Sequence, residues 1–162
     1  MSPAAARRFY DGRKYDVPGS VGHCLMHLMM MMRREVESRM AAHGLTDAQW
    51  KPLWMLKTGR AATAIELARE MLVDAGAITR MLDRLETKAL IERVRSETDR
   101  RVVHLRLTAA GEAVVEHVPH VLAAVNNDFL RGFNEKEFQQ LRGFIDRMAA
   151  NGQGLQDERT AA

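Results

Sequence analysis

Apolar residues recur at every third or fourth position through most of the chain, a spacing that predicts helices with one buried face. The first helix is predicted over residues 20–42, with Ser20 as its N-cap and Gly44 as its stop. Its apolar face would consist of Leu25, Leu28, Met29, Met32, Val36 and Met40. Five further helices are predicted to begin after the capping residues Thr46, Thr63, Asp74, Thr108 and Asn134. We expect them to end near Gly59, Leu72, Lys88, Arg131 and Ala150, with a bend near Pro119.

Between the helices that begin after Asp74 and Thr108, the period of the apolar pattern changes from 3.6 residues to two residues. Residues 91–96 and 102–107 alternate between apolar and polar positions, which predicts two half-buried strands. The six residues that connect them, 96–101, contain no large apolar side chain, so we expect a turn that projects into water. The predicted fold class is mainly α with a small β-hairpin.

The hairpin also concentrates positive charge. Residues 93–106 contain five arginines against Glu97 and Asp99, a surplus of three that equals the formal net charge of the whole chain. With a pI of about 9.3, the chain is suited to an anionic partner. A rigid hairpin with arginines at its tip is well shaped to meet a phosphate backbone.

The 162 residues suggest a single domain with appended segments. We expect a flexible arm over residues 1–19, one domain over 20–150 and a frayed tail over 151–162. The apolar run from Cys24 to Met32 is too short to cross a bilayer, and no signal peptide is evident. The single cysteine fits a reducing compartment, so the cytoplasm is the predicted location, and no membrane is expected as a partner.

Two short helices followed by a hairpin predict a winged helix-turn-helix. If the second helix buries Ile78, Met81, Leu82 and Leu85, it turns Gly76, Thr79, Arg80, Asp83 and Arg84 outward. A glycine, a hydroxyl and a long cation at the start of a helix suit entry into the DNA major groove. At the hairpin tip, Asp99 could orient the Arg101 guanidinium for insertion into a minor groove. The alternatives are a solvated helix face and an ordinary charged turn.

Here the chain resembles the multiple-antibiotic-resistance regulator (MarR) family. The resemblance is carried by Asp99, Arg101, Leu105, Leu107 and Thr108 in the pattern D-x-R-x-x-x-L-x-L-T, followed by Gly111, and by the segments 76–86 and 90–93. It runs from about Val21 to Ala150. It implies helices for dimerisation at 20–43 and 109–150 around a DNA-binding module at about 46–108.

The resemblance also implies a function. Family members bind a pseudo-palindromic operator as homodimers, usually as repressors. Thr79 and Arg80 would then read the major groove and Arg101 the minor groove, whereas Ala75 offers no longer polar contact. The residues expected to contact double-stranded DNA are Thr63, Gly76, Thr79, Arg80, Arg84, Arg95, Asp99, Arg100 and Arg101.

A homodimer is also expected from the terminal helices, which are too apolar to be solvated alone. The best candidates for a core between subunits are Phe129, Phe133, Phe138 and Phe144. The alternative is that these aromatic rings pack within one chain.

The resemblance further implies a small aromatic or carboxylate effector, bound between the DNA-binding module and the helices that dimerise. A second stripe of the first helix offers imidazole, thioether and guanidinium groups, and two tryptophans on the next helix could form aromatic walls. The expected ligand-binding residues are His23, His27, Met30, Arg34, Trp50 and Trp54. Methionine and tryptophan at helical spacing are also typical of an ordinary core.

The sequence also leaves open that the protein senses an oxidant or a metal ion. Cys24 could sense oxidants, although the only tyrosines that could activate it, Tyr10 and Tyr15, lie in the arm, and a buried, inert thiol is the preferred interpretation. A metal could bind at His23 and His27 or at His117 and His120, but no carboxylate has a convincing spacing, so neither a metal nor another cofactor is predicted. Motifs of nucleophilic, phosphate-binding and zinc-dependent enzymes are missing from the sequence, so no enzyme is predicted. A dimeric adaptor that does not bind DNA is the alternative of another class.

Overall fold

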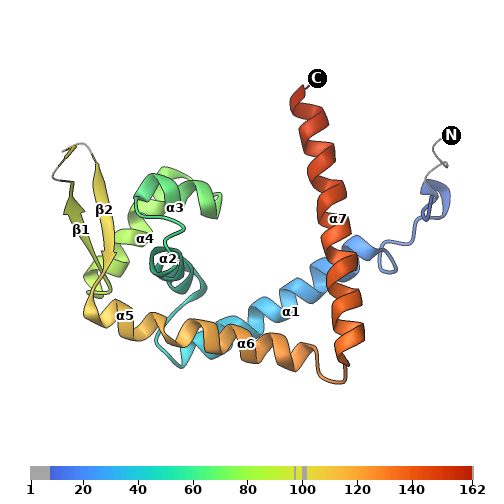
Figure 1. The fold of residues 1–162 in the computed structure, drawn as a ribbon, viewed down its shortest axis with the longest axis horizontal. Coiled ribbons are helices and arrows are strands. Elements are labelled where there is room, and N and C mark those ends of the chain that lie inside the picture. The colour runs from blue at the N-terminus through green and yellow to red at the C-terminus, as the bar shows by residue number, and fades with distance from the viewer. Residues whose placement is uncertain (1–7, 97, 100–101, 162) are drawn as a thin grey trace. The chain divides into compact units, whose positions relative to one another are not determined.

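The computed structural model describes residues 8–96, 98–99 and 102–161. The predicted fold class is confirmed: the described residues are mainly helical, with one antiparallel hairpin (Figure 1). The elements are a short 3-10 turn at Gly12–Lys14, α1 (Val21–Ala41), α2 (Asp47–Lys57), α3 (Ala64–Met71), α4 (Ala75–Thr87), β1 (Ile91–Arg95), β2 (Val103–Leu107), α5 (Ala109–Val115), α6 (His117–Phe129) and α7 (Glu135–Ala161).

The predicted capping residues precede the helices that they were expected to begin. The Oγ atom of Ser20 accepts from the His23 N–H at 3.3 Å, and an Asp74 carboxylate oxygen accepts from the Ala77 N–H at 2.9 Å. The other four predicted caps, Thr46, Thr63, Thr108 and Asn134, lie directly before α2, α3, α5 and α7. Capping is a local interaction that satisfies N–H groups left free in the first turn, so it is readable from the sequence.

The predicted bend near Pro119 is found as a break between α5 and α6. The helix is interrupted at Glu116, three residues before the proline. Proline has no N–H to donate to the carbonyl four residues earlier, which is that of Val115, and its ring crowds that carbonyl. The break therefore lies in the turn that Pro119 deprives of a hydrogen bond.

The predicted end of the last helix is wrong. The helix α7 does not end near Ala150 but continues to Ala161, so residues 151–161 are helical where a frayed tail was expected. The last turns contain side-chain bonds at helical spacing, from Gln153 Nε2 to Asp157 Oδ1 at 3.1 Å and from the Thr160 hydroxyl to the Gln156 carbonyl at 3.0 Å. The helix includes Gly152 and Gly154 despite the low helix propensity of glycine, and these side-chain bonds favour the helical conformation there.

The chain divides into two compact units, residues 1–125 and 126–162. In the first unit the helix-turn-helix and the hairpin share a core of fully buried aliphatic side chains, among them Leu53, Leu67, Ile78, Leu82, Leu85 and Ile91. In the second unit, no described residue of α7 is buried. Among the described residues, no helix is both long enough and apolar enough to cross a membrane.

The hairpin pairs Ile91 with Leu107 and Arg95 with Val103 in antiparallel register. A third segment joins it at the start of α3. Thr63 forms a bridge with His104, and the Leu105 N–H donates to the Ala62 carbonyl at 2.8 Å. The hairpin is thus fixed to the helix-turn-helix by its backbone as well as by its core side chains.

The base of the hairpin is closed by a tight contact with α5. The Thr108 hydroxyl donates to the Ala89 carbonyl at 2.6 Å, and the Thr108 N–H donates to the Leu90 carbonyl at 3.1 Å. Gly111, one turn into α5, lies directly against the same carbonyl. A Cβ atom at Gly111 would be 2.0 Å from the Leu90 oxygen, so only glycine fits there.

Within the expected flexible arm, residues 1–7 lie outside the described residues. The remainder has local structure: Asp11 caps the 3-10 turn, and the Tyr10 hydroxyl oxygen accepts from the Val21 N–H at 2.9 Å. Tyr10 and Tyr15 form an edge-to-face pair with ring centroids 5.5 Å apart. This segment therefore makes contacts with the first turn of α1.

Candidate nucleic-acid interface

The candidate interface consists of the exposed face of α4 and the hairpin beside it, both in the first unit. The predicted orientation of α4 is confirmed: Ile78, Leu82 and Leu85 are buried and Met81 is half-buried. The residues on the opposite face are all exposed, namely Gly76, Thr79, Arg80, Asp83 and Arg84. The helix thus presents a polar face to solvent along its whole length.

The first turn of α4 is organised by Asp74. The N–H of Ala77 donates to the Asp74 carboxylate, which holds the pKa of that carboxyl below its usual range, and Arg80 lowers it further. The Arg80 guanidinium lies near this cap, because a Cβ atom at Gly76 would be 3.1 Å from Asp74 Oδ1 and 3.6 Å from Arg80 Nη1. The carboxylate therefore stays charged at neutral pH and lies near Arg80.

The two threonines predicted to contact DNA have partners within the protein. The Thr79 hydroxyl donates to the Ala75 carbonyl at 2.8 Å, so its oxygen lone pairs remain the groups that can meet a donor from DNA. The Thr63 hydroxyl accepts from the Glu66 N–H at 3.3 Å, and the Glu66 carboxylate accepts from the N–H groups of Ala62 and Thr63. These backbone bonds lower the pKa of Glu66, with Ala62 contributing most.

The hairpin is tied to α4 by Arg93, which was not among the predicted site residues. Its Nη2 atom lies 2.7 Å from Asp83 Oδ1, and its Nη1 atom lies 2.7 Å from Glu86 Oε2. One guanidinium thus bridges two carboxylates of α4. The signal was present in the sequence, because Arg93 shares a strand face with the buried Ile91 and must point toward the helix.

These ion pairs also reduce the free charge of the hairpin. Of the five arginines counted there, Arg93 is neutralised by α4, and Arg106 lies opposite Glu92 in the strand register. Arg95 is exposed near the end of β1. The surplus of the hairpin therefore falls from three to one, with Arg95, Arg100 and Arg101 remaining against Glu97 and Asp99.

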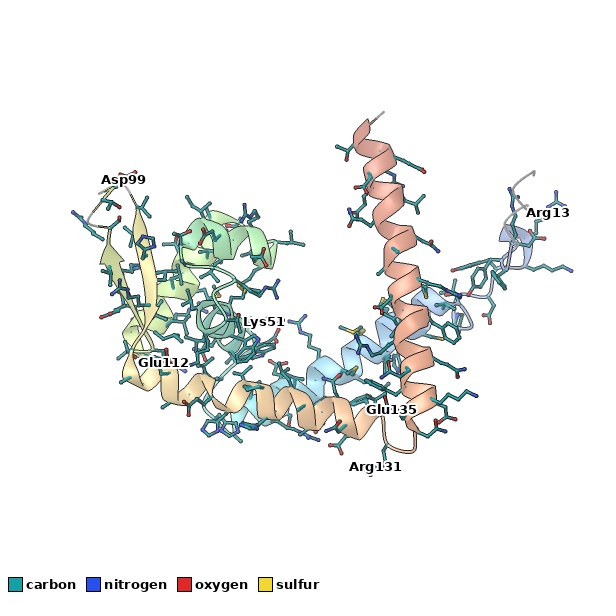
Figure 2. All side chains as sticks on the ribbon, viewed as in Figure 1. Arg13, Lys51, Asp99, Glu112, Arg131 and Glu135 are labelled. Carbon is teal, nitrogen blue, oxygen red and sulfur yellow. The ribbon has the colours of Figure 1, made fainter. Side chains whose placement is uncertain are left out.

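At the tip, the turn is held by backbone and hydroxyl bonds. The Ser96 N–H donates to the Val102 carbonyl at 3.0 Å, the Val102 N–H donates to the Asp99 carbonyl at 2.9 Å, and Ser96 Oγ accepts from the Asp99 N–H at 3.2 Å. Figure 2 shows Asp99 at the end of the hairpin. The predicted contacts of Arg100 and Arg101 lie outside the described residues.

This arrangement agrees with known proteins. The model of the MarR family matches residues 45–103, from the residue before the α2 cap to the first residue of β2. The crystal structure of YusO from Bacillus subtilis is 32% identical and has a TM-score of 0.65, with 80% of this chain and 92% of that chain covered. The chain belongs to the MarR family. It is therefore a DNA-binding transcriptional regulator with a winged helix fold.

Two further solved structures match over most of the chain. The transcriptional regulator PA3341 is 30% identical with a TM-score of 0.70, and 83% of this chain and 99% of that chain are covered. A mutant MarR from E. coli, solved in complex with operator DNA, is 25% identical with a TM-score of 0.69 over the same shares, 83% and 99%. The likeness therefore extends well beyond the segment matched by the family model.

The structure separates the six predicted ligand-binding residues. His23, His27, Met30 and Arg34 follow one line along α1, where the rings of the two histidines are parallel with centroids 6.4 Å apart. Trp50 and Trp54 are half-buried in α2, and the Trp50 indole donates to Asp47 Oδ1 at 3.2 Å. A hollow where α1 faces α2 and α3 is built from other residues.

This hollow has a volume of about 690 Å³, and the buried Asp47 is one of its lining residues. Asp47 Oδ2 lies 2.8 Å from both Arg33 Nη2 and Lys51 Nζ, so two cations share one carboxylate. Figure 2 labels Lys51 on α2. The lining is completed by Glu37, Thr46, Ala48, Met55, Glu70, Met71 and Val73. Of the six predicted residues, only Trp50 is linked to it, through Asp47.

Two other predictions concern the thiol of Cys24 and a metal site formed by histidines. Cys24 is exposed, so the preferred interpretation of a buried thiol is wrong; its Sγ donates to the Pro18 carbonyl at 3.7 Å. No three side chains of histidine, cysteine, aspartate or glutamate gather as a metal site among the described residues. The alternative of a metal sensor thus lacks a ligand set of these residue types in the part of the chain that the structure describes.

Proposed function

We propose that this MarR-family regulator is a cytoplasmic homodimeric repressor that binds a pseudo-palindromic operator and leaves it when a small aromatic or carboxylate effector binds. The observation that carries the proposal is the exposed polar face of α4, fixed by Arg93 to a hairpin whose turn contains Arg100 and Arg101 in its sequence. A helix and a wing held together in this way can reach two adjacent grooves of one half-site. The operator complex of the similar E. coli protein supports the same partner.

Each predicted DNA contact has a role in this proposal. Thr79 and Arg80 read base edges in the major groove, with Gly76 allowing the backbone to approach. Arg101, oriented by Asp99, enters the minor groove. The residues left to contact phosphates are Thr63, Arg84, Arg95 and Arg100.

The proposal is tested by recovering DNA bound to the protein in cells and measuring affinity for the recovered sites at several salt concentrations. We expect the logarithm of the binding constant to fall linearly with the logarithm of salt, with a slope of about −0.9 for each phosphate contacted. An adaptor that does not bind DNA would enrich no sequence and show no such slope.

Dimerisation is proposed from the apolar surface that one chain leaves uncovered. In α1, Met26, Met29 and Met30 are each more than half exposed, at 55%, 63% and 52%. In α7, large apolar residues recur at spacings of three, four, three and seven and none is buried. They form an α7 seam of Phe138, Leu141, Ile145, Met148 and Leu155. Such a stripe is typical of a helix that packs against another helix.

We expect Ile145→Glu to raise the dimer dissociation constant at least about 100-fold, because a buried and unpaired carboxylate costs several kcal/mol. Sedimentation equilibrium measures the change. Gln140→Glu, on the same helix but outside the α7 seam, is the matched control and should leave the constant within about threefold of the wild-type value. Equal effects of the two variants would place the interface elsewhere.

For the effector we propose the hollow around Asp47. Because Arg33 and Lys51 share one carboxylate, a ligand carboxylate can take one of the two cations, while Met55 and Met71 provide flexible apolar walls. Glu70 is paired with Arg60, whereas Glu37 opposes an anionic ligand. Neutral phenols therefore belong in the test panel beside aromatic acids.

Replacing Lys51 by methionine is expected to weaken binding of an aromatic acid by about tenfold or more, since a charged hydrogen bond is lost, and to affect a phenol less. Titration followed by tryptophan fluorescence measures the affinity for the aromatic acid and for the phenol, because Trp50 donates a hydrogen bond to Asp47. Lys136→Met in α7 controls for the lost charge. If no aromatic acid or phenol of the panel binds the wild-type protein, the effector proposal fails.

A further inference from the structure

One face of α1 carries nitrogen and sulfur donors that the proposed effector does not use. It consists of His23, Met26, His27 and Met30, and each of these residues lies three or four positions from two of the others. Residues at such spacings are neighbours on a helix surface, with Cβ atoms about 5–6 Å apart. The four side chains therefore form one continuous surface, the His/Met face of α1.

The His/Met face is open to solvent. Met26 and Met30 are 55% and 52% exposed, His27 is exposed and His23 is half-buried. The two imidazole rings are parallel, with planes inclined by 3° and centroids 6.4 Å apart. Among the described residues, no hydrogen bond or ion pair involves either ring. The ring nitrogens and the thioether sulfurs can therefore be reached by an ion from solvent.

The residue types of this segment select among metal ions. Residues 20–32 contain no Asp, Glu, Lys or Arg, so the hard cations Mg²⁺ and Ca²⁺ find no carboxylate ligand there. Zinc takes imidazole, thiolate and carboxylate ligands, and no three side chains of these types gather among the described residues. Thioether sulfur is a soft ligand that favours Cu(I), and imidazole also binds copper. Two imidazoles beside two thioethers therefore fit Cu(I).

The helix can bring these donors to one ion. Two histidines four residues apart on a helix bind a single metal ion in the H-E-x-x-H motif, so the spacing of His23 and His27 is suitable. Methionine is unbranched and has three rotatable bonds, which lets the sulfur of Met26 or Met30 approach an ion held by the rings. Because these side chains lie at the surface, they can rotate without disturbing the core.

We propose that the His/Met face of α1 binds one Cu(I) ion through the imidazole nitrogens of His23 and His27 and the thioether sulfurs of Met26 and Met30. None of these residues lines the hollow around Asp47. The site is therefore separate from the one proposed for the aromatic effector, and it gives the regulator a ligand of another class, a soft metal ion.

The test is anaerobic calorimetric titration of the untagged protein with Cu(I) kept in solution by acetonitrile. It uses the C24S background, so that the exposed thiol of Cys24 takes up no copper. We expect C24S to bind one Cu(I) per chain. In C24S/M26L/M30L the affinity should fall at least about tenfold, since even the loss of a group behind a metal ligand typically costs that much. Absence of binding to C24S, or an unchanged affinity in C24S/M26L/M30L, would overturn the proposal.

The matched control is C24S/M29L/M32L, which removes two thioethers three residues apart on the same helix but outside the His/Met face. It should keep the copper affinity within about threefold of C24S. A loss as large as that in C24S/M26L/M30L would mean that copper binds methionine on α1 without a defined site, and would contradict the proposal.

Met26 and Met30 also belong to the apolar surface from which dimerisation is proposed. Leucine has a similar volume and apolar character but no sulfur, so C24S/M26L/M30L should dimerise like C24S in sedimentation equilibrium. If it does not, C24S/H23Q/H27Q replaces it, and an unchanged copper affinity in that variant would overturn the site. Copper binding is measured without operator or aromatic effector, so its failure is distinct from a failure of the proposed function.

Discussion

Replacing Gly111 by alanine is expected to lower the free energy of unfolding by about 3 kcal/mol, at the upper end of the range for overpacking. The new Cβ atom would lie 2.0 Å from the Leu90 carbonyl oxygen, which is backbone and cannot turn aside. Any shift of that carbonyl would also disturb its hydrogen bond from the Thr108 N–H. Urea unfolding monitored by circular dichroism measures the loss.

Gly143→Ala is the matched control, since Gly143 is also in a helix but has no atom within 4 Å of the position of a Cβ. There the substitution should raise stability by up to about 1 kcal/mol, because alanine has the higher helix propensity. If both variants behaved alike, the close approach of α5 to the hairpin base would be refuted.

Replacing Arg80 by alanine is expected to weaken operator binding by about 1–3 kcal/mol, the usual range for a specific contact. Arg80 is exposed near the first turn of α4, beside the Asp74 cap. The salt dependence then separates two roles. Loss of a base contact relaxes specificity at particular positions and leaves the slope unchanged, whereas loss of a phosphate contact reduces the slope by about one.

Arg131→Ala removes the same charge from the second unit, where Arg131 pairs with Asp128 at 2.9 Å. It should leave operator affinity within about twofold, because Arg131 is not among the proposed DNA contacts and its charge is already paired with Asp128. Fluorescence anisotropy with operator and mismatched duplexes measures both variants. An unchanged affinity in Arg80→Ala would contradict the proposed role of α4 in the DNA interface.

Local rules predicted much of the fold. Helix starts were predicted correctly because a cap needs only the N–H groups of its own first turn, as at Asp74. The end of α7 was missed because glycine at positions 152 and 154 argues against a helix, whereas spacing-dependent contacts such as Gln153–Asp157 favour it. Propensity alone could not weigh these two effects.

The candidate site was predicted less completely. The outward face of α4 follows from helical periodicity and was correct. The hollow around Asp47 was not predicted because its lining comes from three helices, and no pattern within one helix indicates how they face one another. The stack of His43 on His117, with ring centroids 4.2 Å apart, was missed for the same reason, since the whole DNA-binding module lies between the two residues in the sequence.

The two ion pairs of Arg93 set the distance between the hairpin and α4. Because one guanidinium joins β1 to both Asp83 and Glu86, we expect the hairpin and α4 to keep their spacing when the protein binds DNA. Inserting one base pair between the bases that each would touch displaces them by about 3.4 Å and turns them by about 35°. A hairpin on a flexible connection could follow that displacement, whereas a hairpin joined to α4 by Arg93 is not expected to follow it. Operators of this protein should therefore vary in sequence far more readily than in the number of base pairs between these two contacts.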